Sequence, residues 1–182
     1  MKNAVRTGTF IRGAICTSPN IVEKNIEYSL ASVAHYFRVG LIAGICTPDQ
    51  ARDWAMTVIG QMDEPPGEVI EVSWRKPQEK LLADLKAVKG DVDFSLLCRW
   101  LLATLAQQLD AGNMSLSSAM RRAKVIASAT DSVDLYETLD WIEDGLYLAD
   151  KEFCGMVEQY RQEFDQLLGH EAVAPSFLPA AR

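Results

Sequence analysis

Acidic side chains gather in residues 131–152, where eight aspartates and glutamates accompany one basic residue, Lys151. Carboxylates at this density can hold a divalent cation, which prefers oxygen ligands, or attract a basic partner. The spacing argues against a metal column along this segment. Its carboxylates from Asp131 to Glu143 recur every three residues, and three residues turn a helix by about 300°, so the row spirals around the helix.

One aromatic residue, Trp141, lies among these acids. A helix whose apolar stripe faces inward directs the residues between its stripe positions toward solvent. An exposed tryptophan flanked by carboxylates is typical of a surface that anchors a basic protein. The alternative is that Trp141 packs under a neighbouring element while the acids only keep the helix solvated. We predict a partner-binding face formed by Asp134, Glu137, Asp140, Trp141 and Asp144, opposite a stripe of Leu135, Leu139, Ile142 and Leu146.

Two carboxylate pairs leave a catalytic alternative open. Glu68 and Glu71 are three residues apart, as are Glu137 and Asp140. Helical nucleotide hydrolases hold Mg²⁺ with pairs of this spacing on facing helices, because Mg²⁺ takes an octahedral set of oxygen ligands. However, the first pair follows two prolines, and such pairs are common on solvated helix faces. We therefore expect no metal site, no cofactor and no catalytic residue.

Motifs of the common enzyme classes are absent from the sequence. It contains no GxxxxGK[ST], GxGxxG, HExxH, EF-hand loop or GxSxG. The two histidines, His35 and His170, are expected on the surface, so a cysteine or serine nucleophile would lack its usual base. The four cysteines share no CxxC spacing and are expected to be free thiols.

The composition narrows the class of partner. A chain of 182 residues with 48% hydrophobic content can build one core, and its net charge of −7 argues against binding nucleic acid or a membrane surface. No apolar run approaches the ~20 residues of a membrane span. The first residues lack the apolar core of a signal peptide. We expect a cytoplasmic protein whose partner is another protein, and the oligomeric state stays open.

Apolar periodicity predicts an all-α domain of about seven helices over residues 1–170, followed by a loosely held tail over residues 171–182. The clearest helix start is Thr47-Pro48-Asp49-Gln50, which has the form of a capping box with proline at the first helical position. A strand is predicted for residues 8–17. Residues 68–74 can form either a short extended segment or a helical turn.

The same periodicity assigns the core and the basic surface. The residues central to their apolar stripes are expected to be deeply buried. These residues are Trp54, Trp100, Leu101, Leu105 and Phe164. A cationic group formed by Arg121, Arg122 and Lys124 is expected to be a solvated helix face.

Residues 40–74 carry a resemblance to a known class of protein. A helix ending near "VGLI" precedes the capped start, the tryptophan–alanine helix "ARDWAMTVIGQMD", the break "EPP" and the run "GEVIEVSW". This arrangement resembles bacterial toxin immunity proteins of the polymorphic-toxin and contact-dependent-inhibition type. The resemblance implies a small helical protein without catalytic residues that binds and neutralises a cognate toxin.

Immunity proteins of this type commonly block nucleases, whose active sites are basic because they bind phosphates. The resemblance therefore implies that an acidic, aromatic-bearing face occupies such a site as a nucleic-acid mimic. Two other functions remain open. One is a helical adaptor or regulator without a toxin partner, and the other is the carboxylate–metal hydrolase.

Overall fold

A computed structural model describes residues 28–151, 156–175 and 177. This part of the chain forms eight α-helices and contains no strand, so the all-α prediction is confirmed there. The strand predicted for residues 8–17 lies outside the described residues. The helices are α1 (Leu30–Ala43), α2 (Pro48–Gln61), α3 (Gly67–Ser73), α4 (Gln78–Ala87), α5 (Phe94–Asp110), α6 (Leu116–Ala129), α7 (Val133–Asp150) and α8 (Val157–Glu171).

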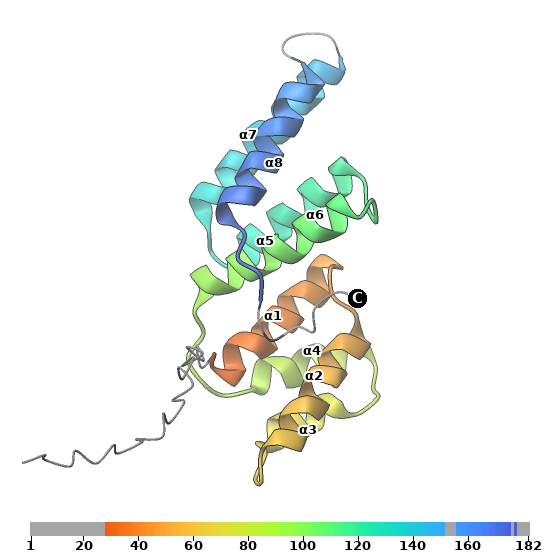
Figure 1. The fold of residues 1–182 in the computed structure, drawn as a ribbon, viewed down its shortest axis with the longest axis vertical. Helices are drawn as coiled ribbons and strands as arrows, with labels where there is room; N and C mark the ends of the chain where they lie inside the picture. The colour runs from red at the N-terminus through yellow and green to blue at the C-terminus, as the bar shows by residue number, and fades with distance from the viewer. Residues whose placement is uncertain (1–27, 152–155, 176, 178–182) are drawn as a thin grey trace, which may run out of the picture.

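The helices lie in three tiers along the long axis (Figure 1). Helices α1 to α4 form the lower tier, α5 and α6 cross the middle, and α7 and α8 project from the top as a hairpin. Helix α1 packs against α5 and α6, while α8 packs on α5 and α7 packs on α6. The middle pair therefore joins the lower helices to the hairpin.

Polar caps fix where several helices begin. The predicted capping box is present, because the Thr47 hydroxyl accepts from the Gln50 backbone and the Gln50 side chain accepts from the Thr47 backbone. Ser29, Asp93 and Ser115 cap α1, α5 and α6 in the simpler way, each accepting a backbone N–H three residues on. These caps satisfy amide groups that have no partner inside the helix.

Residues 67–73 form a short helix, so the extended alternative for this segment is wrong. Pro66 occupies the N-cap position, and Glu68 lies in the first turn, where a carboxylate is favoured by the helix dipole. Val69 and Val72 are both fully buried. Their three-residue spacing places them on one helix face, where a strand would direct them to opposite faces.

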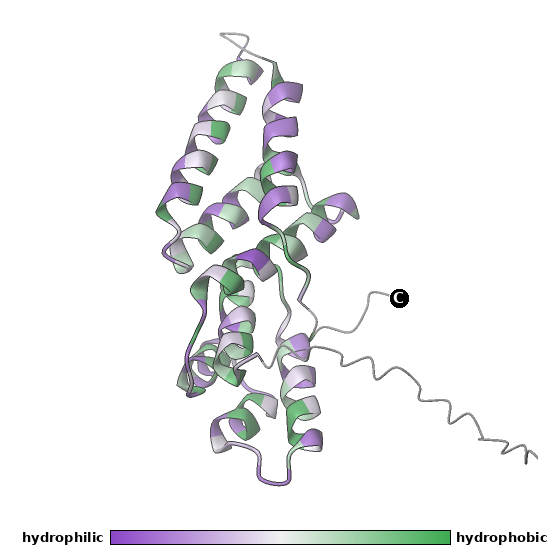
Figure 2. Ribbon diagram, turned by 60° about the vertical axis from the view of Figure 1, so that its left-hand side comes forward, coloured by the Kyte–Doolittle hydropathy of each residue, from purple (hydrophilic) through white to green (hydrophobic). Residues whose placement is uncertain are grey.

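The predicted core residues Trp54, Trp100, Leu101, Leu105 and Phe164 are all buried. Together with α1 they belong to one continuous apolar cluster that reaches from α2 to α8. Helices α7 and α8 carry hydrophilic as well as hydrophobic residues along their whole length (Figure 2). The hairpin therefore contributes to the core with only part of its surface.

The chain beyond α8 returns to the core. Helix α8 extends to Glu171. The Val173 N–H donates to the Arg99 carbonyl oxygen at 3.2 Å. The Phe177 ring then lies edge-on to Trp100 with the ring centroids 4.9 Å apart. The described part of the segment expected to be a loose tail thus contacts the core.

Candidate partner-binding face

Helix α7 turns its apolar stripe inward, as its periodicity predicts. Leu139 and Ile142 are buried, whereas Leu135 and Leu146 are partly buried against the core. The stripe faces α6 and α8, on which α7 packs. The opposite face of α7 must therefore be directed toward solvent.

The five residues predicted to bind a partner are all exposed on this helix. They are Asp134, Glu137, Asp140, Trp141 and Asp144, which we call the acidic face. The structure places them on one helix, separated from the core by the inward stripe. Trp141 retains 57% of its accessible surface, so the alternative in which it packs under a neighbouring element is wrong.

Among the described residues, Trp141 nevertheless has one aromatic neighbour, Tyr160 of α8. The two ring centroids are 5.7 Å apart and the rings are inclined at 66°, an edge-to-face arrangement that aromatic pairs favour. Tyr160 is held in turn by Gly145, where an added Cβ would lie 2.2 Å from the tyrosine Cε1. This contact fixes one edge of the exposed indole and leaves the rest of it accessible.

Lys124 of α6 binds the other flank of the acidic face. Its Nζ donates to Asp140 Oδ1 at 2.6 Å and to Glu143 Oε2 at 2.7 Å, and it lies 5.2 Å from the centroid of the Tyr136 ring. Hydrogen bonds to Asp140 and then to Glu143 raise the pKa of Lys124 above its ordinary value. The expectation that Lys124 belongs to a solvated basic face is therefore wrong.

The carboxylates of the acidic face are not equivalent. Asp140 is paired with Lys124, whereas Asp134, Glu137 and Asp144 form no ion pair with any residue that the structure describes. Unpaired exposed carboxylates retain their attraction for a cationic partner. The unpaired carboxylates of the acidic face are therefore Asp134, Glu137 and Asp144, and the last two lie between Asp140 and Trp141 around the helix.

A groove of about 620 Å³ borders the base of the hairpin between α5, α7 and α8. Asp134, Thr138 and Leu167 line it, together with Arg99 and Glu171. The Arg99 Nε donates to the Glu171 carbonyl oxygen at 3.2 Å, which links α5 to the end of α8. The acidic face therefore ends at Asp134 in a concave surface that contains one guanidinium group.

The two carboxylate pairs of the hydrolase hypothesis are far apart. Glu68 and Glu71 lie on α3 at one end of the molecule, while Glu137 and Asp140 lie on α7 at the other (Figure 1). Within the described residues, no three histidine, cysteine, aspartate or glutamate side chains form a group suited to a metal ion. The geometry thus does not bring the two pairs onto facing helices.

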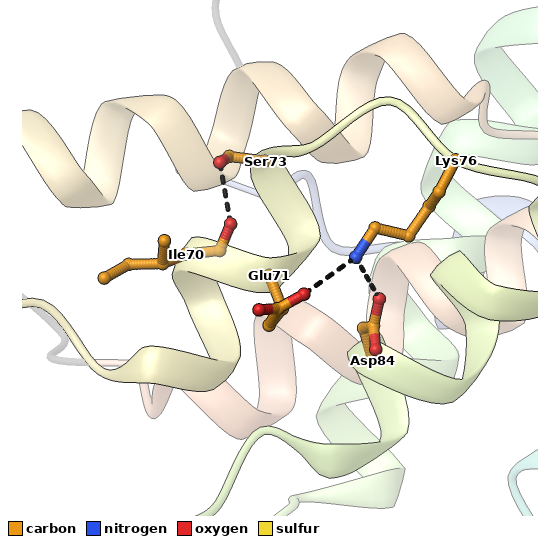
Figure 3. Close-up of polar contacts among 5 residues, drawn as sticks. All are labelled: Ile70, Glu71, Ser73, Lys76 and Asp84. Atoms are coloured by element: carbon orange, nitrogen blue, oxygen red, sulfur yellow. Dashed lines mark hydrogen bonds and ion pairs between the residues drawn. The ribbon is translucent and has the colours of Figure 1, made fainter.

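A lysine approaches the α3 carboxylates (Figure 3). Lys76 Nζ lies 2.5 Å from Asp84 Oδ2 and 3.2 Å from Glu71 Oε2. Lys89 pairs with Glu68 at 3.0 Å. Burial opposes the positive charge of Lys76, but hydrogen bonds to Asp84 and Glu71 outweigh this effect and raise its pKa. The cation of this cluster is thus supplied by the protein itself.

The remaining titratable groups of note lie in the core or at its edge. His35, which was expected on the surface, is half-buried, and its Nδ1 lies 3.2 Å from the Ala31 carbonyl oxygen. Burial lowers its pKa. Burial also raises the pKa of the Cys46 thiol to about 11. A thiol with this pKa is almost entirely protonated at neutral pH, which makes it a poor nucleophile.

Sequence reasoning found the acidic face but missed Tyr160 and Lys124. Both come from other helices, and their contacts with α7 join residues 12 to 19 positions apart. Gly145 could have indicated the first contact, because a glycine inside a helix often marks a close approach by another element.

Comparison with protein-family models, curated proteins and solved structures finds no match for this chain. No helix in the described part of the chain combines the length and the apolar character that a membrane span requires.

Proposed function

We propose that this chain is an immunity protein, without catalytic activity of its own, that binds and neutralises a basic, nuclease-like toxin through its acidic face. One observation carries the proposal. Trp141 is exposed between Glu137 and Asp144, two carboxylates that have no ion-pair partner among the described residues. The resemblance of residues 40–74 to toxin immunity proteins supports the same function.

The two kinds of side chain would contribute differently to binding. A large aromatic side chain that becomes buried in an interface is a frequent hot spot, worth ~2 kcal/mol or more on truncation to alanine. The free carboxylates would act mainly on association, because they attract a basic partner over a distance of about one Debye length. Trp141 would anchor the complex, and Glu137 and Asp144 would steer the partner toward it.

Asp140 would contribute less than its position in the sequence implies. Its carboxylate is already bound to Lys124, so a partner cation would have to compete with that ammonium group. Lys124 also ties α7 to α6 and thereby holds the acidic face in one orientation. A face that is ordered before binding loses less conformational entropy when the complex forms.

The test uses the protein encoded directly upstream of this gene, because immunity genes lie beside the genes of their toxins. The purified toxin domain should bind the wild-type chain, and co-expression should protect cells from it. Trp141→Ala should weaken binding about 30-fold, mainly through faster dissociation. The matched control is Trp74→Ala, since Trp74 is 56% exposed and follows α3 at the far end of the molecule.

Charge reversal tests the steering role separately. Asp144→Lys should slow association and flatten its salt dependence. Glu79→Lys, the same charge reversal at an exposed position of α4, should do neither. Binding without protection would instead favour an adaptor. An upstream protein that is neither toxic nor bound by this chain would overturn the proposal.

A further inference from the structure

The free end of the α7–α8 hairpin carries large apolar side chains in contact with solvent. Tyr147 and Leu148 lie in the last turns of α7, and Met156 and Val157 lie where α8 begins. All four are exposed, Met156 to 69%. We call these four residues the hairpin tip. They lie far from the core that the base of the hairpin helps to form (Figure 1).

The hairpin tip differs from the scattered apolar residues that any surface contains. Its four members come from the adjoining ends of two helices that pack on each other. The buried residues by which α8 joins the core are Phe164 and Leu168, two to three turns away from the tip. Clustered exposed apolar side chains at the end of a projecting element commonly mark an interaction surface.

The hairpin tip also continues the acidic face. Leu148 follows Trp141 by seven residues and Asp144 by four, so the three side chains lie along one side of α7. Beside them, the Gly145–Tyr160 contact fixes α7 to α8, and the ion pairs of Lys124 fix α7 to α6. The apolar tip and the acidic face therefore form one surface on a helix that its neighbours hold in place.

Charge decides which partner fits this surface. Helix α7 carries six carboxylates and no lysine or arginine, so a second copy of the chain would bring like charges together along the hairpin, which is unfavourable. A basic protein offers the complementary charge. Its surface must also include an apolar cleft, since the tip presents aromatic and aliphatic side chains that gain by leaving water.

We propose that the hairpin tip inserts into an apolar cleft at the rim of the basic active site of the toxin, while the acidic face covers the site itself. This inference rests on the proposed function and adds a second contact region to it. The tip would contribute binding free energy that does not depend on salt, and the acidic face would contribute an electrostatic attraction that salt screens.

The experiment measures the affinity of the upstream-encoded toxin domain for tip variants at two salt concentrations. Leu148→Ser and Met156→Ser should each weaken binding at least about tenfold, with the salt dependence of the wild type retained. Met56→Ser is the matched control, because Met56 is 57% exposed on α2 and should leave the affinity unchanged. Melting curves establish that each variant is folded. If Leu148→Ser does not fold, Met156→Ser alone tests the tip, because Met156 is the more exposed of the two residues.

The outcomes separate this inference from the proposed function. If Trp141→Ala weakens binding but both tip variants bind as the wild type does, the tip inference is wrong and the proposed function stands. If the wild-type chain binds no toxin, both fail. Sedimentation of the free protein should show a monomer. A dimer that Met156→Ser dissociates would identify the tip as a self-association surface and overturn the inference.

Discussion

Trp100 on α5 and Trp141 on α7 have opposite surroundings, although both helices pack on α6 and on α8. Trp100 is fully buried, with the rings of Tyr28 and Phe177 packed edge-on at centroid distances of 4.7 and 4.9 Å. Trp141 has a single aromatic neighbour among the described residues and is mostly exposed. The body of the molecule buries Trp100 in its core, whereas the hairpin leaves Trp141 and the residues of its tip available for binding.

The charged groups of the two regions differ in the same sense. In the lower tier, Lys76 is itself largely buried and is bound to two carboxylates. In the hairpin, Lys124 binds the two acids on one flank, whereas Glu137 and Asp144 beside Trp141 have no ion-pair partner among the described residues. A count of acids would rank both regions as candidate sites. Of these two clusters, the hairpin has unpaired carboxylates to offer a partner, whereas Glu68, Glu71 and Asp84 are already bound to lysines.

The largest contrast in stability is expected between two leucines. Leu101→Ala should lower the free energy of unfolding by ~2–5 kcal/mol, because it opens a cavity at a fully buried position. Leu148→Ala in the hairpin tip should change it by less than about 0.5 kcal/mol, as exposed substitutions usually do. Urea unfolding of the two variants measures both values. Similar losses would mean that the tip is packed, which would remove the contrast between the regions.

A smaller effect is expected at the contact that holds the hairpin together. Gly145→Ala would place a Cβ within 2.5 Å of two Tyr160 ring atoms and should cost ~1–3 kcal/mol through overpacking. The control is Gly169→Ala on α8, where nothing lies within 4 Å of the added carbon. That change should stabilise the helix by up to ~1 kcal/mol. Equal stabilities for the two variants would show that α7 and α8 pack less closely than described.

The smallest difference is expected between the two lysines. Lys76→Met should destabilise the fold by ~1–2 kcal/mol, because it leaves Asp84 unpaired in a partly buried position. Lys124→Met should destabilise it by less than ~1 kcal/mol, because the carboxylates that Lys124 binds are more exposed. Thermal unfolding at neutral pH compares them. A larger loss of stability in Lys124→Met than in Lys76→Met would mean that the ion pairs of the hairpin, and not those of the lower tier, stabilise the fold most.

The contribution of Lys76 to stability depends on pH, and the sign of this dependence follows from the direction of its pKa shift. Folding raises the pKa of Lys76 above its ordinary value of 10.5, so the folded state holds the proton more tightly than the unfolded state does. The contribution of Lys76 to stability is therefore fully present below pH 10.5 and is lost as the pH rises through the folded pKa. The difference in the free energy of unfolding between the wild type and Lys76→Met should therefore become smaller as the pH rises above 10.5.

The sequence by itself determined most of the helices and the direction of their faces. Thr47, Pro48 and Gln50 define a helix start through bonds three residues apart, and the leucine stripe of α7 requires Asp144 and Trp141 to point outward. Both are consequences of local geometry, since 3.6 residues per turn relates neighbours in the chain to neighbours on a face. The binding role of this face and its toxin partner stay predictions.

Only the tertiary structure decided which charges are free and which apolar residues are covered. Lys124 meets Asp140 across 16 residues, and Tyr160 meets Trp141 across 19, so neither pairing leaves a periodic signal in the sequence. Residues 67–73 were ambiguous for the same reason, because the burial of Val69 and Val72 depends on neighbouring α2 and α4. Local periodicity orients a side chain relative to its own helix, but the packing of other helices determines what that side chain meets.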